Sequence, residues 1–367
     1  MDNIYDLWIG DRQIQTPIAV SSMAGITDGA YIRGRAGHIG IGFIGGYAID
    51  TKTISAARII HETGREEFLP QDPVSEIIAQ IAQIQDTGVI PGANIRTSDV
   101  NALVHLAQAI GDRIIYEIDA HCRQQPMIDA GCGEYLLHHQ EHLIAYVQAL
   151  KIAGVIVSVK IRAGVATDDA ALTRLLWKAG ADIIHVDLMD YGHTKLRDIR
   201  NASPVFLIAN NGITHFDKAK EMFAHGADMV SLARRSDPET LAGLHESLAQ
   251  YTREHGWYNS PKQLCRGGDI RSLTFCCMPV KPCPLLPALE QVGVSPQEFV
   301  NMKIEGVKGT PLEEGTGTCF GSLSYCCKDS TPCMFRDGVL RQQGVKRTAY
   351  MQLKRDLSKK IMQKIFS

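Results

Sequence analysis

The feature that most constrains the fold is a series of eight short, β-branched apolar segments between residues 16 and 235. Stretches of helical period separate them, so strand-like and helix-like segments alternate along the chain. Eight such units fit a closed parallel (β/α)8 TIM barrel, an α/β fold, better than the alternative of an open doubly wound sheet. The strand-like segments are residues 17–23, 42–49, 88–95, 113–120, 154–161, 181–188, 204–210 and 227–233.

One helical stretch, residues 167–180, shows how the sequence marks element boundaries. Thr167 can cap its first turn, and Gly180 can end it. Leu172, Leu175 and Leu176 fall on one face at helical spacing, so we expect that face to be buried.

Length and composition leave room for a second, smaller unit behind the barrel. The chain has 367 residues, of which 45% are hydrophobic and 21% are charged, as is typical of globular proteins. A further helical stretch ends near residue 254, where the composition changes. We therefore predict a barrel over residues 1–255 and a cysteine-rich module with a basic C-terminal helix over residues 256–367.

The amino terminus gives an expectation about location. Residues 1–15 lack a basic segment followed by an apolar run, and no stretch approaches the ~20 apolar residues of a membrane helix. We expect a cytoplasmic protein that has no membrane partner.

The ends of the strand-like segments carry the polar residues, which is where a barrel of this kind places its chemistry. The last two segments end in Asn-Asn-Gly at 210–212 and Ala-Arg-Arg at 233–235. Loops at these positions hold a phosphate in many barrels, and the Arg234 guanidinium could add a charge-assisted bond. Lys160 ends the fifth segment and points at the same mouth. The pattern predicts a cofactor that carries a phosphate.

The order of motifs over residues 16–235 resembles the dihydrouridine synthase family. The segment at 20–28, VSSMAGITD, is similar to the family's alanine-proline-methionine-alanine-glycine signature, with Ser22 in place of the proline. The segment at 159–164, VKIRAG, matches the family's valine-lysine-(isoleucine or methionine)-arginine-x-glycine. The resemblance implies FMN. With the two loops above, the predicted cofactor-binding residues are Ser22, Met23, Ala24, Asn94, Lys160, Asn210, Gly212, Ala233 and Arg234.

The same resemblance implies catalytic roles for Cys122 and Lys160. The segment at 117–123, EIDAHCR, is similar to the family stretch whose cysteine donates a proton to the uracil ring. Cys122 takes that place, and we expect its neighbours His121 and Arg123 to lower the pKa of the thiol. The alternative for Cys122 is a small buried apolar group, which is our interpretation of Cys132.

Departures from the family pattern lie on the substrate side of the site. His121 and Arg123 stand where the family has glycine and proline, and Asp-Leu-Met at 187–189 replaces its histidine-glycine-arginine. The second replacement removes a flavin-contacting imidazole and a substrate-side arginine of the family pattern. The changes keep the rest of the implied flavin contacts, and they disfavour uridine in transfer RNA as the substrate. His185 is expected to be a core histidine.

Eight of the ten cysteines lie between Cys265 and Cys333. The string SLTFCC at 272–277 recurs as SLSYCC at 322–327, and each copy ends in Pro-Cys. Eight thiols can close two four-sulfur metal sites, of iron-sulfur type or zinc, and a disulfide framework is the alternative. The predicted ligands are Cys265, Cys276, Cys277, Cys283, Cys319, Cys326, Cys327 and Cys333.

This cysteine-rich module resembles the carboxy-terminal domain of the methanogenesis marker protein 9 family. The resemblance rests on the two aromatic-Cys-Cys repeats within eight cysteines. Some members of that family carry a dihydrouridine-synthase-like barrel ahead of the module. The resemblance implies a role linked to methane metabolism and names no reaction.

Two helices are expected within residues 256–367. Ser-Pro-Gln-Glu at 295–298 has the form of a capping box. Leu353, Leu357, Ile361 and Ile365 recur at every fourth position, which predicts an amphipathic helix from residue 347. Residues 334–367 contain nine Lys or Arg and two Asp, so this segment has a net charge of +7, whereas the whole chain has a net charge of −2. Such a basic segment is expected either to form a solvent-exposed helix face or to bind an anionic partner.

Three functional hypotheses follow. The leading one is an FMN-dependent oxidoreductase that acts on an unknown small molecule or RNA, with a cysteine module that exchanges electrons with a partner protein. The second is a tRNA-dihydrouridine synthase that uses NAD(P)H and places the basic tail on tRNA phosphates. The third is a metal-dependent regulatory protein whose barrel has no catalytic activity.

Overall fold

A computed structural model of the chain describes residues 4–5, 7–203, 205–255, 289–313, 340–341 and 343–366. The chain divides into two compact units, Leu7–Ala249 and Met1–Asp6 with Gln250–Ser367. The larger unit contains the eight segments that were predicted to be strands.

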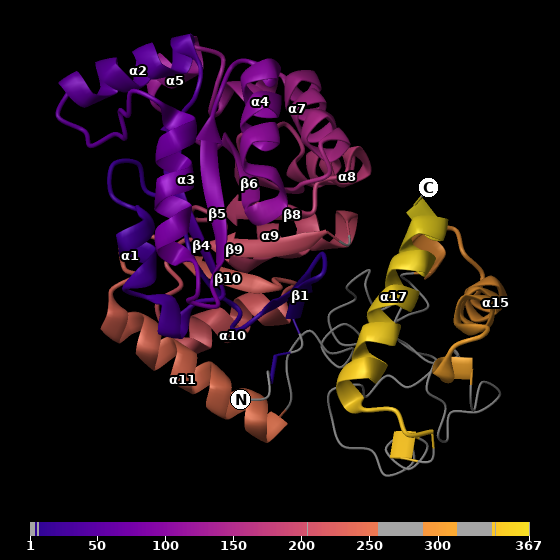
Figure 1. Ribbon diagram of the computed structural model, residues 1–367. Helices are drawn as coiled ribbons and strands as arrows, with labels where there is room; N and C mark the ends of the chain where they lie inside the picture. The colour runs from indigo at the N-terminus through magenta and orange to yellow at the C-terminus, as the bar shows by residue number, and fades with distance from the viewer. Residues whose placement is uncertain are drawn as a thin grey trace. The chain divides into compact units, whose positions relative to one another are not determined.

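The larger unit is a closed barrel of eight parallel strands, as the sequence predicts (Figure 1). The strands follow one another around the barrel in chain order, and β10 pairs with β3 to close it through Val230 and Ile18. Its strands are β3 (Ile18–Val20), β4 (Ile41–Ala48), β5 (Ile90–Arg96), β6 (Ile115–Ala120), β7 (Ile156–Arg162), β8 (Ile183–Asp187), β9 (Phe206–Asn210) and β10 (Met229–Leu232).

Helices connect the strands and cover the outside of the barrel (Figure 1). Strand and helix alternate because the apolar face of each helix must be buried against the apolar outer face of the sheet. The helices are α1 (Gly29–Arg33), α2 (Thr51–Glu62), α3 (Pro73–Ile84), α4 (Val100–Ile110), α5 (Gln125–Asp129), α6 (Tyr135–His138), α7 (Gln140–Ile152), α8 (Asp169–Ala179), α9 (Gly192–Ala202), α10 (Phe216–Ala224) and α11 (Pro238–His255).

The barrel interior is tightly packed along β4 and β5. Every residue of β4 is buried, and Gly92 on β5 lies directly against the ring of Phe43. A Cβ atom at Gly92 would lie 2.5 Å from that ring, closer than real side chains approach. The glycine therefore allows the phenyl ring to fill the barrel.

Two details of the barrel differ from the sequence predictions. The cap of α8 is Asp168 rather than Thr167, because the Asp168 carboxylate accepts the N–H groups of Ala170 and Ala171. Leu175 is 43% exposed, so the buried face of α8 is narrower than expected. Gly180 ends the helix in the left-handed conformation, as predicted. The chain also forms an unpredicted hairpin of β1 (Leu7–Ile9) and β2 (Arg12–Ile14).

The smaller unit contains both of the helices that were expected there. In α15 (Pro296–Val307) the capping box is present, with Ser295 and Glu298 each bonding the other's backbone N–H. In α17 (Arg347–Phe366) the predicted apolar face packs into a core with Phe299. The eight clustered cysteines lie outside the described residues, so their predicted metal sites stay a prediction.

Within the described ranges, no helix combines the length and apolar character needed to cross a membrane.

Candidate cofactor-binding and active site

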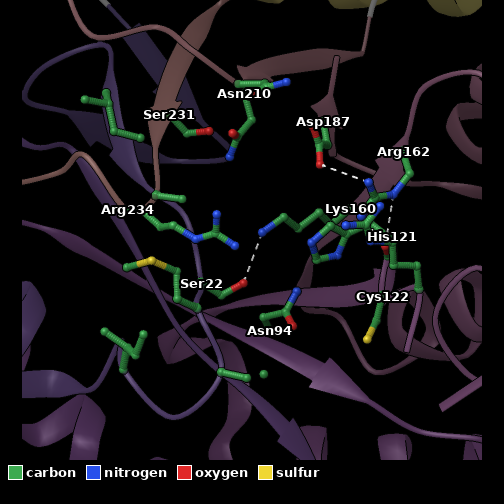
Figure 2. Close-up of a pocket in the computed structure, with 18 of the residues that line it drawn as sticks. Ser22, Asn94, His121, Cys122, Lys160, Arg162, Asp187, Asn210, Ser231 and Arg234 are labelled. Carbon is green, nitrogen blue, oxygen red and sulfur yellow. Dashed lines mark hydrogen bonds and ion pairs between the residues drawn. The ribbon is translucent and has the colours of Figure 1, made fainter. Parts of the chain in front are cut away.

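A cavity of about 870 Å³ opens at the carboxyl ends of the barrel strands (Figure 2). Its walls come from the segments that follow most of the strands, which are far apart in sequence. Every barrel residue predicted for the site lines it: Ser22, Met23, Ala24, Asn94, Cys122, Lys160, Asn210, Gly212, Ala233 and Arg234. The structure thus brings the predicted residues together, and the roles given to them stay predictions.

Lys160 is a buried cation at the base of this cavity. It lies on β7 and is only 2% exposed, and its Nζ donates to the Ser22 hydroxyl at 3.2 Å. Figure 2 shows the amine reaching toward Ser22 and Arg234. A buried ammonium group needs compensating negative charge, and the nearby Glu117 carboxylate acts electrostatically on it.

Glu117 and His185 form the centre of a hydrogen-bonded chain inside the barrel. Glu117 accepts from Asn94 Nδ2 at 2.9 Å and lies 2.7 Å from His185 Nδ1. The other ring nitrogen of His185 contacts the hydroxyls of Ser21 and Ser231 at 3.0 and 2.8 Å. His185 is completely buried, so the prediction of a core histidine is confirmed, although its surroundings are polar.

Burial and hydrogen bonding set the charges in this chain. Burial lowers the pKa of His185, despite the opposing effect of Glu117. Burial works against ionisation of Glu117, but His185, Lys160 and Asn94 outweigh it and keep the pKa of Glu117 below its usual value. We infer a neutral imidazole that donates from Nδ1 to a carboxylate, which leaves Lys160 as the compensated cation.

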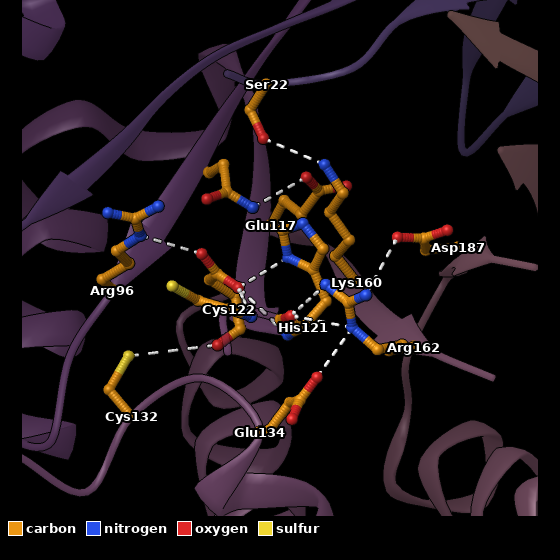
Figure 3. Close-up of polar contacts among 12 residues, drawn as sticks. Ser22, Arg96, Glu117, His121, Cys122, Cys132, Glu134, Lys160, Arg162 and Asp187 are labelled. Atoms are coloured by element: carbon orange, nitrogen blue, oxygen red, sulfur yellow. Dashed lines mark hydrogen bonds and ion pairs between the residues drawn. The ribbon is translucent and has the colours of Figure 1, made fainter. Parts of the chain in front are cut away.

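A second polar cluster surrounds Asp119, at the end of β6, and Figure 3 labels its partners Arg96, His121 and Cys122. Its Oδ1 accepts from the backbone N–H groups of His121 and Cys122, each at 3.0 Å, and lies 2.8 Å from His121 Nδ1. Its Oδ2 accepts from Arg96 Nε at 2.9 Å, and Arg96 also pairs with Glu67 at 2.7 Å. One buried carboxylate therefore fixes the turn that carries both His121 and Cys122.

Cys122 is nearly buried, and the expected lowering of its pKa is wrong. Burial raises the pKa of the thiol, and this effect exceeds the lowering by Arg96. The side chain packs in an apolar cluster with Ala57, Ile60 and Met127, although the residue also borders the cavity. The sequence-based argument failed because it considered the neighbours His121 and Arg123 and could not account for the burial of the thiol. Cys132 is fully buried, as predicted.

Arg162 organises the side of the cavity where the sequence departs from the dihydrouridine synthase pattern. Its Nε lies 2.7 Å from Glu134, and a second nitrogen lies 3.9 Å from Asp187. It also donates to the backbone oxygen of His121 at 3.1 Å. Asp187 and Met189 border the cavity beside it, so an acidic and an apolar side chain occupy this wall.

The loops after β9 and β10 form the basic end of the cavity. Asn211 and Gly212 adopt positive φ, with values of 103° and 67°, which turns the chain sharply before α10. Within the described ranges, the amide N–H groups of Gly212 and Arg234 donate to no protein acceptor. The exposed Arg234 side chain points into the cavity in Figure 2. Free amides beside a guanidinium suit an anion.

Three charged residues that hold other residues of the site in place were not predicted from the sequence. Glu117, Arg96 and Asp119 are charged residues inside otherwise apolar strands, and all three are at most 3% exposed. A charge at an inward position of a buried strand is a signal that could have marked them. Which partners they contact depends on the register between strands, which one sequence does not reveal.

Comparison with known proteins gives relatives without an assigned activity. A scan against protein family models finds no match. Over 107 residues, 29% of this chain, the sequence is 47% identical to "Uncharacterized protein MJ0115" of Methanocaldococcus jannaschii and covers 69% of it. Over 254 residues, 66% of this chain, it is 28% identical to "Uncharacterized protein MJ0144" of the same organism and covers 96% of it.

Solved structures show similarity at the level of the fold. The DHODH of Eimeria tenella, solved in complex with ferulenol, superposes with a TM-score of 0.52 and 12% identity, over 69% of this chain and 85% of that chain. A FabK mutant from Thermotoga maritima gives a TM-score of 0.40 and 18% identity, over 61% and 63%. On sequence identity, the chain belongs to the same family as MJ0115 of Methanocaldococcus jannaschii.

Proposed function

We propose that this protein is a flavin-dependent oxidoreductase that binds FMN in the cavity at the barrel mouth. The observation that carries the proposal is the convergence of ten separately predicted residues on that cavity. They lie at the ends of β3, β5, β6, β7, β9 and β10, so the barrel gathers the residues that the family motifs associate with FMN around one cavity. The TIM barrel fold, which this chain shares with the DHODH structure, is compatible with the proposal.

The donor groups around the cavity fit the two ends of FMN. The free amide of Gly212 and the Arg234 guanidinium would hold the phosphate. The Lys160 ammonium, buried and bonded only to Ser22 in the described ranges, would face the polar edge of the flavin ring. A cation at that place stabilises the negative charge that reduction adds to a flavin.

The protein groups around the reacting position have separable roles. FMN, when bound, would supply a centre that accepts or donates a hydride. Lys160 would hold the charge, while the Glu117 carboxylate, fixed by His185, would balance the charge of the lysine. The Cys122 thiol, protonated because burial raises its pKa, is one group that could give up a proton.

The finer assignment is a dihydrouridine-synthase-like enzyme with a substrate other than uridine in transfer RNA. It is supported by the motifs at 20–28 and 159–164, and by Asp187 and Met189 on the substrate side. We further propose that the eight clustered cysteines bind iron-sulfur clusters or zinc and pass electrons to the flavin or a partner protein. The resemblance of the module to the methanogenesis marker protein 9 family supports a role linked to methanogenesis, and we propose that this role is in the cytoplasm.

Anaerobic purification tests both parts of this proposal. We expect an oxidised flavin absorption spectrum, about one FMN released per chain on denaturation, and iron with sulfide, or zinc, bound to the protein. Dithionite should bleach the flavin bands. A colourless protein with intact fold that takes up no added FMN would contradict the flavin assignment. A flavin-loaded protein without metal would contradict only the role of the cysteine module.

A further inference from the structure

His121 has a position in the cavity that the proposed function leaves without a role. Its side chain is 21% exposed and borders the cavity. Its Nδ1 lies 2.8 Å from Asp119 Oδ1, while Nε2 has no hydrogen-bonding partner among the residues that the structure describes. The free ring nitrogen is therefore available to a ligand.

The state of Asp119 determines which ring nitrogen of His121 carries the proton. Burial would favour a neutral acid, but His121 and Arg96 outweigh this effect and hold the pKa of Asp119 well below its usual value. An ionised carboxylate can only accept hydrogen bonds, so Nδ1 must be the donor. In neutral His121 the lone pair is then on Nε2, which is the atom that gains or loses a proton.

The orientation of the ring is fixed from both sides. The backbone N–H of His121 is bound by the same Asp119 oxygen as its ring, and its backbone carbonyl accepts from Arg162. Arg162 is itself held by Glu134 at 2.7 Å. Figures 2 and 3 show the ring beside the Lys160 side chain. These contacts pre-organise His121 as a buried aspartate does in other acid–base pairs.

Cys122 is placed differently, although it is the next residue. Its sulfur points away from Lys160 and from the His121 ring in Figure 2 and packs with Ala57, Ile60 and Met127. The backbone of Cys122 is also restrained, because Gly133 lies so close to the Cys122 carbonyl oxygen that a Cβ atom at position 133 would collide with it. Of the two neighbours, His121 presents the more accessible proton-carrying atom.

We propose that Asp119 and His121 form an acid–base dyad in which Nε2 of His121 holds the proton that accompanies the hydride. This inference rests on the proposed binding of FMN. If a hydride donor supplies two electrons and one proton to bound FMN, the cavity would gain one negative charge, and Nε2 of His121 would take up a second proton from solvent. An unsaturated substrate accepts the hydride at one atom of a double bond and the Nε2 proton at the other, which restores FMN and neutral His121.

The charges around His121 come from several strands and favour this cycle. Asp119 places a carboxylate against Nδ1 of the ring, and reduction of bound flavin would add a further negative charge to the cavity. The arginines on this side of the cavity, Arg96 and Arg162, are partly neutralised by their own carboxylate partners. The charged or titratable groups that line this part of the cavity or lie behind it are Arg96, Glu117, Asp119, Cys122, Arg123, Glu134, Lys160, Arg162, His185 and Asp187.

The midpoint potential of the flavin, measured against pH in the full-length holoprotein, tests the dyad without a known substrate. Each proton taken up with two electrons contributes about 30 mV per pH unit. Between about pH 6 and 8 the wild type should lose about 60 mV per pH unit, for two protons. His121→Gln keeps the backbone contacts and should lose only about 30 mV per pH unit.

Two further variants decide between His121 and its alternatives. His142→Gln, at an exposed histidine outside the cavity, should keep the wild-type slope. Equal slopes in the wild type and His121→Gln would overturn the proposal, and so would a slope that falls in Cys122→Ala instead. A slope that also falls in the His142 variant would overturn it, because the extra proton would then not belong to His121.

Nitrogen-15 NMR of the flavin-free protein separates this inference from the proposed function. The His121 ring should show the Nδ1–H tautomer in the wild type and a mixture of tautomers in Asp119→Asn. Protonation at Nε2 alone in the neutral wild-type ring would overturn the dyad, whether or not FMN binds. Failure to bind FMN with the expected tautomer would instead contradict the proposed function alone.

Discussion

Arg234 is the residue whose charge should matter most for cofactor binding. It is exposed at the basic end of the cavity and has no carboxylate partner among the described residues. Arg234→Glu would place a carboxylate against the phosphate of FMN, so we expect binding at least tenfold weaker, with an unchanged circular dichroism spectrum. Arg58→Glu, on the outer helix α2, is the matched control. Equal FMN affinity in both variants would remove Arg234 from the site.

Asp119 should contribute to stability as well as to the site. Its pKa in the folded protein is well below its usual value, so its contribution is complete above about pH 4, the unfolded pKa, and is lost as pH falls through the folded pKa. Asp119→Asn leaves the buried Arg96 with one carboxylate and should cost roughly 3 kcal/mol at pH 7. Urea unfolding at pH 7 and pH 3 checks this. A difference between wild type and variant that does not shrink at pH 3 would contradict the assignment.

The sequence allowed the lining of the cavity to be predicted but not its internal contacts. Ser22, Asn94 and Lys160 could be placed because barrel strands deliver their carboxyl ends to one mouth. The contact of Asp119 with residues 121 and 122 arises from a tight turn after β6, which the alternation of a strand does not predict. The pKa of Cys122 was wrongly predicted because burial was not visible in the sequence.

At the scale of single elements, α8 offers a direct test of helix capping. Asp168 accepts the N–H groups of Ala170 and Ala171 at 2.9 and 3.0 Å, whereas Thr167 lies outside the helix. Asp168→Ala should lower the free energy of unfolding by about 1 kcal/mol, and Thr167→Ala should change it little. Thermal unfolding of the two variants checks this. A larger loss in Thr167→Ala would favour the cap inferred from sequence.

Elements with a strong period were predictable, and short or irregular ones were not. The eight strand segments are β-branched apolar runs and α17 carries a clear period of four residues, and all of them are present. The β1–β2 hairpin has strands of three residues each, too short for a period to be detected. The exact start of α8 was missed by one residue, because Thr167 and Asp168 are both good caps.

At the scale of the whole molecule, we expect the barrel to keep its cofactor when the cysteine module is disrupted. The barrel unit Leu7–Ala249 has its own core and contains the complete cavity. Structural metal sites supply on the order of 10 kcal/mol to small modules. Cys277→Ser should therefore make the chain after residue 264 sensitive to protease while FMN stays bound.

Limited proteolysis followed by mass spectrometry locates the cleavage sites in that experiment. His142→Gln, which leaves the cysteines untouched, serves as the control. A Cys277→Ser protein that resists protease as well as the wild type would contradict a metal-dependent fold for the module. Loss of FMN together with cleavage would contradict the independence of the barrel.

Calorimetric titration of the flavin-stripped protein with FMN, compared with riboflavin, tests the central claim most directly. Riboflavin has the same ring system and lacks the phosphate, so it cannot use the basic end of the cavity at Gly212 and Arg234. We predict one FMN bound per chain, and riboflavin bound at least tenfold more weakly because the phosphate contacts are lost. No heat of binding for FMN, or equal affinities for the two flavins, would contradict a flavin site built on these loops.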